Sequence, residues 1–195
     1  LPDTSERMEQ CEAATKALEA NGYKAIGMDH FAKEDDPLYQ AYCNHTLKRN
    51  FQGYTTDNAD VLLGFGLSAI SRFPQAYIQN TTSFKDYKED IASGVFPVQK
   101  GCLRSADDRL RHDVIEQFLC YFELDAGTVC QKHGLEPSYL EESLSDLDDM
   151  IEDGLIKKQG YRLQVTDLGR LFIRTICARF DAYFNETVKR HVNAV

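Results

Sequence analysis

The chain contains no long hydrophobic run among its 195 residues. A membrane-spanning helix needs roughly 18–20 consecutive apolar residues, and no segment approaches that length. Residues 1–21 are charged throughout, which is not the pattern of a signal peptide. Internal repeats and low-complexity tracts are also missing. We therefore expect a cytoplasmic protein that neither crosses nor binds a membrane.

Closely spaced cysteines are absent as well. The six cysteines lie at least ten residues apart, so they form neither a metal-binding C-x-x-C pair nor the framework of a small disulfide-linked domain. Most lie in apolar surroundings, which favours reduced thiols packed in a core. The histidines that could join them share no ligand spacing: His45, His112, His133 and His191. We expect no metal site on this chain.

Basic residues are in the minority, with 22 Lys and Arg against 31 Asp and Glu and a net charge of −9. A surface of this sign repels phosphates and opposes non-specific binding to nucleic acid. The hydrophobic share of 43% and the charged share of 27% are those of an ordinary folded protein. Disordered and fibrous classes are therefore excluded.

The first hundred residues alternate between helical and strand patterns. A helix that starts at Asp3 and ends at Asn21-Gly22 precedes a short buried strand over residues 23–31. Further elements are expected over 38–47 (helix, with Pro37 in its first turn), 61–70 (strand), 76–79 (strand) and 83–93 (helix). Helix followed by strand is the repeating unit of an α/β barrel. We expect residues 1–100 to form the final elements of a partial (β/α) barrel, within an α/β (α+β) fold.

Beyond about residue 100 the helical period dominates. The expected elements are helices over 105–121, 125–133 and 139–153, a β-hairpin over 154–165 and a last helix over 166–184. This order outlines a mainly helical, winged-helix-like domain over residues 101–195. Many winged helices bind DNA through a basic helix. The candidate helix here is acidic, with Glu141, Glu142, Asp146, Asp148, Asp149 and Glu152, so we expect no nucleic-acid partner.

Two short segments, Gly27–Ala32 and Arg49–Thr56, mix apolar, glycine and ionisable residues without a regular period. Such polar groups are typical of strand ends, where α/β folds bind ligands. His30 could accept a proton or, when charged, bind a carboxylate. Asp29 could set its tautomer, although adjacent residues on a strand point to opposite faces and argue against a simple dyad.

Three arginines are candidates to bind carboxylates, because a guanidinium matches a carboxylate with two parallel hydrogen bonds. They are Arg49, Arg109 and Arg111. Exposed salt bridges explain any one of them equally well. A fourth pattern, Gly64–Ala69, fits the G-x-G-x-x-A dinucleotide fingerprint, but no amphipathic helix follows Gly66. The glycines could instead let the backbone approach a bulky ligand.

Five motifs in register resemble the oxygen-independent coproporphyrinogen III oxidases, radical S-adenosylmethionine (SAM) enzymes of haem biosynthesis. They are Gly27–Ala32, Arg49–Thr56, Leu62–Ser71, Asp107–Ile115 and Gly169–Cys177, and the likeness ends at Phe180-Asp181-Ala182-Tyr183. The resemblance implies oxidative decarboxylation of two propionates of coproporphyrinogen III to the vinyl groups of protoporphyrinogen IX. It implies that a reduced [4Fe–4S] cluster cleaves SAM to a radical that removes a propionate β-hydrogen.

The resemblance also implies roles for particular residues. Ile70 matches a position that contacts the cluster-bound SAM, and Gln52 matches one near a second SAM position. His30 and Arg49 are the tentative substrate-binding residues. The family holds its cluster on C-x-x-x-C-x-x-C, and that spacing is missing here. We therefore expect a C-terminal part of the enzyme, inactive alone, whose parent is a monomer.

Two other interpretations stay open at the level of the sequence. The parent could be a paralogue that carries or inserts haem with the same fold. The chain could also be a stand-alone interaction or DNA-binding module, which the acidic charge balance disfavours.

Overall fold

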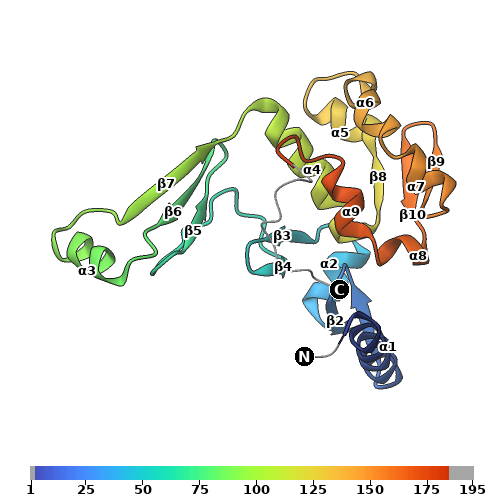
Figure 1. Cartoon of the computed structure of the whole chain (residues 1–195), viewed down its shortest axis with the longest axis horizontal. Helices are drawn as coiled ribbons and strands as arrows, with labels where there is room; N and C mark the ends of the chain where they lie inside the picture. Colours follow the sequence, from blue (N-terminus) through green and yellow to red (C-terminus); the bar gives the residue numbers. More distant parts are fainter. Residues whose placement is uncertain (1–2, 185–195) are drawn as a thin grey trace. The chain divides into compact units, whose positions relative to one another are not determined.

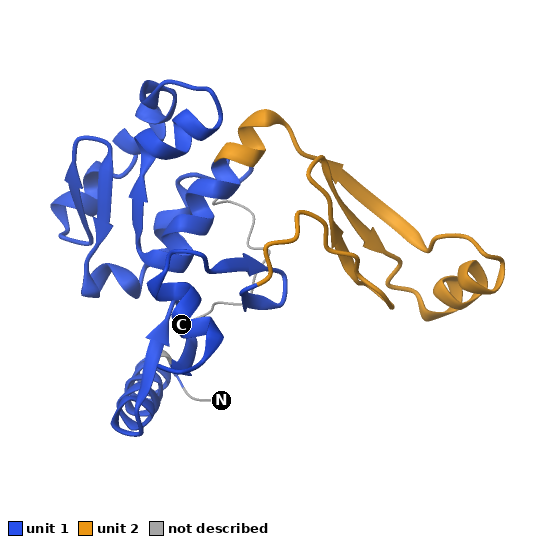
Figure 2. Cartoon of the chain, turned by 180° about the vertical axis from the view of Figure 1, so that it is seen from behind, with its two compact units in different colours: residues 1–56, 111–195 blue, residues 57–110 orange. Residues whose placement is uncertain are grey.

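The computed structural model describes residues 3–184 and divides into two compact units (Figure 2). Unit 1 is formed by residues 1–56 and 111–195, and unit 2 by residues 57–110. These units are defined by contacts within this chain, so the predicted division into residues 1–100 and 101–195 stays a prediction. Among residues 3–184, no helix combines the length and the apolar composition that a membrane crossing needs.

Unit 1 begins with helix α1 (Thr4–Ala20), which is followed by an antiparallel hairpin of β1 (Tyr23–Ile26) and β2 (His30–Lys33). Asp3 caps the helix in a capping box with Glu6, as the sequence predicts for a helix start. The single strand predicted over 23–31 is wrong. Gly27 has φ +56°, and this left-handed conformation turns the chain back on itself after Ile26.

A second hairpin lies close behind the first in sequence. Helix α2 (Pro37–Cys43) has Pro37 in its first turn and Asp36 as its N-cap, and it ends four residues earlier than predicted. Strands β3 (Lys48–Asn50) and β4 (Gly53–Thr55) follow as an antiparallel pair. The two hairpins, α2 and the end of helix α4 (Ala106–Tyr121) share a small buried cluster: Ile26, Ala32, Ala41, Leu47, Tyr54 and Cys120.

The remainder of unit 1 is the winged-helix-like part (Figure 1). Its elements are α4 (Ala106–Tyr121, which starts in unit 2), β8 (Glu123–Asp125), α5 (Ala126–Lys132), the 3-10 helix η1 (Pro137–Leu140), α6 (Glu141–Ser145), α7 (Asp148–Glu152), β9 (Ile156–Gln159), β10 (Arg162–Val165), α8 (Asp167–Arg170) and α9 (Ile173–Ala178). The three strands form an antiparallel sheet in the order β8-β10-β9. The predicted hairpin is therefore confirmed and gains a third strand.

Two predicted helices of this part are interrupted. Residues 137–152 form three short helices, and the final helix is split between α8 and α9. The apolar face predicted for this segment is buried all the same, since Leu140, Leu144 and Leu147, at the i, i+4, i+7 spacing of one helical stripe, are each at most 1% exposed.

Unit 2 contains β5 (Ile70–Arg72), β6 (Ala76–Asn80), helix α3 (Phe84–Ala92) and β7 (Val98–Leu103), with an antiparallel sheet in the order β5-β6-β7. The helix and β6 are confirmed. The strand predicted over 61–70 is wrong, because Leu62 forms only an isolated bridge with Arg72 before β5 begins at Ile70. No helix starts at Gly66, and the next element along the described chain is strand β5, so the dinucleotide interpretation is not supported.

Glycine in this irregular segment serves a close approach within the chain. A Cβ on Gly64 would lie 2.7 Å from the carbonyl oxygen of Ile70. The buried Asn80 amide donates to the carbonyl oxygens of Gly64 and Gly66, at 3.3 and 2.9 Å. The backbone that approaches Gly64 is thus that of β5 rather than a ligand. All strand pairs in the described residues are antiparallel, while the predicted mixture of helix and strand is confirmed.

Candidate functional site

The two N-terminal hairpins interlock around Tyr54, the middle residue of β4. Its hydroxyl accepts a hydrogen bond from the backbone N–H of Met28 at 3.0 Å and donates one to the carbonyl oxygen of Leu119 at 2.6 Å. Met28 lies in the turn of the first hairpin, and Leu119 lies on α4. One buried side chain therefore joins both hairpins to the central helix.

Two glycines allow this close packing. A Cβ on Gly27 would lie 2.1 Å from the Cζ atom of Tyr54, and a Cβ on Gly53 would lie 2.9 Å from Nε2 of His30. Both glycines have positive φ, at +56° and +139°. These are the glycines of the two irregular motifs, and their role is to admit an aromatic ring and an imidazole at contact distance.

His30 is the first residue of β2 and packs edge-on against Tyr54, with ring centroids 4.9 Å apart. Its Nδ1 lies 2.7 Å from Oδ1 of Asp29. The argument that strand geometry separates these two side chains is wrong, because Asp29 belongs to the turn and not to the strand. The pair is partly open to solvent, with side chains 37% and 52% exposed. An imidazole with one nitrogen held by a carboxylate is suited to proton transfer or to binding an anion.

Arg49 faces Tyr54 across the β3–β4 pair, and its guanidinium lies over the tyrosine ring at 4.9 Å. Its backbone N–H donates to Glu116 on α4 at 3.1 Å, and the same carboxylate accepts from Lys48 at 3.1 Å. Within the described residues, the buried Nη1 of Arg49 has no hydrogen-bond acceptor. A buried cationic donor without an acceptor is costly, so an anion brought to this guanidinium would be stabilised.

Two of the ionisable groups packed near Arg49, the Tyr54 phenol and the Cys120 thiol, are neutral near pH 7. Burial raises the pKa of Tyr54 to about 12, although the Met28 N–H and the charge of Arg49 act in the opposite direction. Burial also raises the pKa of the Cys120 thiol to about 12, with a further increase from Glu116. The site thus presents one arginine charge against a neutral phenol and a neutral thiol.

Comparison with known proteins identifies the relatives of this chain. It is 43% identical over all 195 residues to the oxygen-independent coproporphyrinogen III oxidase of Bradyrhizobium diazoefficiens, and 40% identical over 184 residues to that of Pseudomonas aeruginosa. Its homologues are coproporphyrinogen III oxidases. The resemblance inferred from the motifs is confirmed. The chain covers 43% and 40% of these two relatives' lengths, and 58% of the oxidase of Thermostichus vulcanus.

A solved structure gives the same result. The coproporphyrinogen III oxidase HemN of Escherichia coli, described as a radical SAM enzyme, matches with a TM-score of 0.89 and 38% identity. The match covers 94% of this chain and 43% of HemN. A scan against protein-family models found no match.

The cysteines of this chain do not fit the iron–sulfur cluster of a radical SAM oxidase. Cys11, Cys43 and Cys102 are exposed and far apart in sequence, whereas Cys120, Cys130 and Cys177 are buried. Burial raises the pKa of each of these three thiols, which disfavours the thiolate that iron requires. The group within residues 3–184 that could hold a metal ion contains no cysteine.

The two residues matched to SAM contacts in the oxidases lie in different units. Gln52 is exposed in the β3–β4 turn, where its backbone N–H donates to Asn50 at 2.8 Å. Ile70 is half-buried at the start of β5 and pairs with Gln79. An exposed amide and a half-buried aliphatic side chain both fit contacts to a nucleoside. Their roles stay predictions, as do those of His30 and Arg49.

The other two candidate arginines are bound within the fold. Arg111 donates to the Ser143 hydroxyl and to the Phe180 carbonyl oxygen, both at 3.2 Å. Arg109 donates to the carbonyl oxygen of Arg104 at 3.2 Å. Arg109 and Arg111 are therefore bonded within the fold. Of the three candidate arginines, Arg49 is the one with a buried donor that has no acceptor among the described residues.

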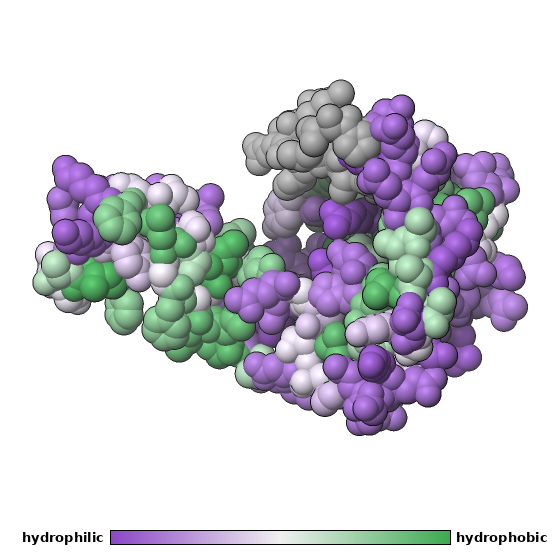
Figure 3. Space-filling view, turned by 90° about the horizontal axis from the view of Figure 1, so that it is seen from below, coloured by the Kyte–Doolittle hydropathy of each residue, from purple (hydrophilic) through white to green (hydrophobic). Residues whose placement is uncertain are grey.

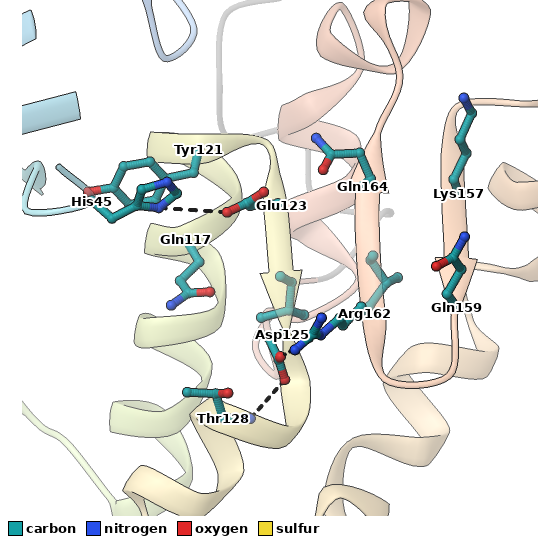
Figure 4. Close-up of a pocket in the computed structure, with 12 residues that line it drawn as sticks. His45, Gln117, Tyr121, Glu123, Asp125, Thr128, Lys157, Gln159, Arg162 and Gln164 are labelled. Atoms are coloured by element: carbon teal, nitrogen blue, oxygen red, sulfur yellow. Dashed lines mark hydrogen bonds and ion pairs between the residues drawn. The ribbon is translucent and has the colours of Figure 1, made fainter. Parts of the chain in front are cut away.

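A cavity of about 610 Å³ lies elsewhere in unit 1, between α4 and the outer face of the β8-β10-β9 sheet (Figure 4). It contains none of the predicted site residues. Asp125 accepts from Arg162 and from the Thr128 backbone, both at 2.9 Å, and His45 lies 3.6 Å from Glu123. Most of its charges are thus paired with one another, which makes the cavity a polar groove without an unpaired reactive group.

The structure also brings together His112, Asp113 and Glu116 on α4, with candidate ligand atoms within 4.8 Å of one another. The sequence argument weighed only histidine and cysteine spacing and missed this group. Both carboxylates already have hydrogen-bonding partners: Asp113 bonds Lys132 and His133, and Glu116 bonds Lys48. An ion would have to displace these partners, so the expectation of no metal site stays a prediction.

Replacement of Asp113 by Asn is expected to destabilise the chain at neutral pH. Burial raises the pKa of Asp113, but Lys132 and His133 more than offset this and hold it below its ordinary value of 3.8. The carboxylate therefore stabilises the fold above about pH 4, and this contribution disappears as the pH falls through the lowered pKa. Urea unfolding should show a loss of about 1–3 kcal/mol at pH 7. An equal loss at pH 3 would contradict this explanation.

Proposed function

We propose that this chain is part of an oxygen-independent coproporphyrinogen III oxidase that converts two propionates of its substrate into vinyl groups during haem biosynthesis. The observation that supports this best is similarity over the whole chain to enzymes of that name, together with a TM-score of 0.89 to HemN. The interlocked site around Tyr54 lies within two of the five motifs that carry the resemblance.

In this proposal, Arg49 and His30 bind a carboxylate of the substrate. Coproporphyrinogen III has four propionate carboxylates, so the enzyme needs cationic anchors. Arg49 has its charge held over Tyr54 and a buried donor without an acceptor. His30 is held by Asp29 on one nitrogen and contacts the same tyrosine. Both side chains contact Tyr54, which supports their assignment to the same substrate-binding region.

Ile70 is proposed to contact the SAM that is bound to the cluster, and Gln52 is proposed to lie near a second SAM position. The glutamine amide offers both a donor and an acceptor to a carboxylate or ribose, and the isoleucine offers an apolar surface to an adenine ring. SAM together with a [4Fe–4S] cluster supplies the radical chemistry in such enzymes. The cluster is proposed to lie on a part of the enzyme that this chain does not contain, so residues 1–195 alone are expected to be inactive.

The setting of the enzyme is proposed from composition and fold. We propose that it is cytoplasmic and monomeric, without a nucleic-acid or membrane partner. The net charge of −9 and the acidic α6 and α7 support the absence of a nucleic-acid partner, because a surface of this sign repels phosphates.

The test is a chimaera in which residues 1–195 replace the matching part of the Bradyrhizobium diazoefficiens relative. We expect the chimaera to decarboxylate coproporphyrinogen III anaerobically with SAM and a reductant, and the 195-residue chain alone to form no vinyl product. Turnover by the chain alone would show that the expected inactivity is wrong.

A further inference from the structure

Unit 2 lacks a hydrophobic core of its own. Of residues 57–110, only Asn80, Thr81, Pro97 and Leu110 are buried, and Leu110, the one large apolar side chain among them, lies on α4, the helix that continues into unit 1. Unit 1 has more than twenty buried hydrophobic residues. Burial of apolar surface is the main favourable term in folding, and a three-stranded sheet needs a packed face to be stable. Unit 2 therefore requires a partner that covers it.

The apolar side chains of unit 2 are instead at its surface. Figure 3 shows hydrophobic residues gathered over the lobe at the left, which is this unit. They come from the irregular segment, from α3 and from both ends of β7: Val61, Leu63, Phe65, Leu67, Phe84, Ile91, Val95, Phe96, Val98 and Leu103. Phe65 and Phe96 are each 88% exposed. Contiguous apolar surface of this kind marks an interaction site.

The distribution of these side chains indicates what kind of partner covers them. A β-bulge places Val98 opposite Asn80 and Leu103 opposite Ala76, on one face of the sheet, but every residue of β7 is exposed, so both faces are open along this strand. β7 is also an edge strand of its sheet. A second copy of the chain, docked through one flat patch, would cover one face and leave the other. A larger body that surrounds the sheet and pairs with its edge covers both.

The relatives supply such a body. The oxidase of Bradyrhizobium diazoefficiens is more than twice as long as the part matched by this chain, because the match covers 43% of it. We propose that the apolar surface of unit 2 is the docking surface for the remaining part of the oxidase polypeptide, which embeds both faces of the β5-β6-β7 sheet. This inference rests on the proposed function for the identity of the partner. It concerns folding and association, and not catalysis.

Docking of unit 2 would also set the position of Ile70, the residue that is proposed to contact SAM. Ile70 begins β5 in the same unit, and Gly64 packs directly against its backbone. A sheet without a core of its own is held in place only when its partner is present, so the position of Ile70 is set by docking. The SAM contact proposed for Ile70 is then completed by the same event that buries Phe65 and Phe96.

Hydrogen exchange of the 195-residue chain and of the chimaera tests the proposal. Amides of β6 and β7 are expected to exchange at least about tenfold more slowly in the chimaera, while amides of β8 and β10 in unit 1 exchange alike in both. Equal exchange of β6 and β7 in the two proteins would overturn the proposal. Protection in the chain alone that rises with its concentration would also overturn it, because the occupant would then be a second copy.

A pair of variants makes the result specific. Phe96→Ser removes an 88% exposed side chain, so it should leave the unfolding of the chain alone unchanged but lower the midpoint of the chimaera and speed exchange in β7. Leu171→Ser, at a 64% exposed residue of unit 1, is the matched control and should change β7 exchange in neither protein. If Phe96→Ser leaves the chimaera unchanged, the proposal is wrong. These readouts need no turnover, so loss of decarboxylation would not affect them.

Discussion

Replacement of Gly27 by Ala is expected to unfold the site around Tyr54. The new Cβ would lie 2.1 Å from Cζ of Tyr54, so the ring or the turn must move. Overpacking of this kind and the strain of a left-handed residue together cost about 3 kcal/mol or more. Displacement of Tyr54 would break its hydrogen bonds to Met28 and Leu119 and remove the surface that positions His30 and Arg49. Urea unfolding of the 195-residue chain measures the loss.

Gly22→Ala is the matched control for this variant. Gly22 also has a positive φ, at +83°, but a Cβ there would meet no atom within 4 Å. Its replacement therefore carries only the backbone strain, about 1 kcal/mol. The difference between the two variants isolates the contact with Tyr54. Equal losses for Gly22→Ala and Gly27→Ala would contradict the role assigned to the tyrosine.

Arg49→Met in the chimaera is expected to have the largest effect on activity. Methionine keeps an unbranched apolar chain against Tyr54 but removes the charge and the donors. Loss of a hydrogen bond to a charged group amounts to about 1.5–3 kcal/mol, so kcat/KM for coproporphyrinogen III should fall by roughly 10–100-fold. Because the carboxylate is bound before and during the reaction, the change should fall mainly on KM. Anaerobic steady-state kinetics measures both constants.

Arg162→Met provides the comparison for the arginine variant. Arg162 is paired with Asp125 in the polar groove of the winged-helix-like part, and no role in substrate binding is assigned to it. Its replacement should leave kcat/KM within about twofold of the parent chimaera. Unchanged kinetics for Arg49→Met, with correct folding shown by circular dichroism, would remove Arg49 from the proposed substrate site.

Local signals in the sequence predicted much of the fold. Three helices begin at or next to the residues that the sequence predicts, and the structure shows Asp3, Asp36 and Ser83 as their caps, since each side chain accepts a hydrogen bond from the backbone of its first turn. The glycine turn between β9 and β10 was equally clear. These features depend on neighbours within a few residues, which is why the chain sequence alone determines them.

The site around Tyr54 depends on contacts that the sequence does not reveal. Tyr54 and Leu119 are 65 positions apart, and no local period links them. The two irregular motifs predict a ligand site because polar groups stand among their apolar and glycine residues. The structure shows that Gly27 and Gly53 make room for side chains of the chain itself. Strand geometry predicts that Asp29 and His30 point apart, and this prediction is wrong because Asp29 lies in a turn.

The segment that leads to Ile70 is a second feature that the sequence does not determine. Its neighbours predicted a strand over residues 61–70, but β5 contains only three residues and starts at Ile70. The segment before β5 is held by hydrogen bonds from the side chain of Asn80, which lies ten positions after Ile70. An apolar, glycine-interrupted run was therefore consistent with a strand and also with an exposed segment that awaits a partner.

The most direct test of the central claim is product analysis of the chimaera after its cluster has been loaded. Coproporphyrinogen III is supplied anaerobically with SAM and a reductant, and the products are oxidised and separated by liquid chromatography. We predict that propionates are lost and vinyl groups appear, and that both depend on SAM. A chimaera that holds its cluster and binds haem, yet leaves coproporphyrinogen III unchanged, would contradict the proposed decarboxylase and favour a haem-carrying paralogue.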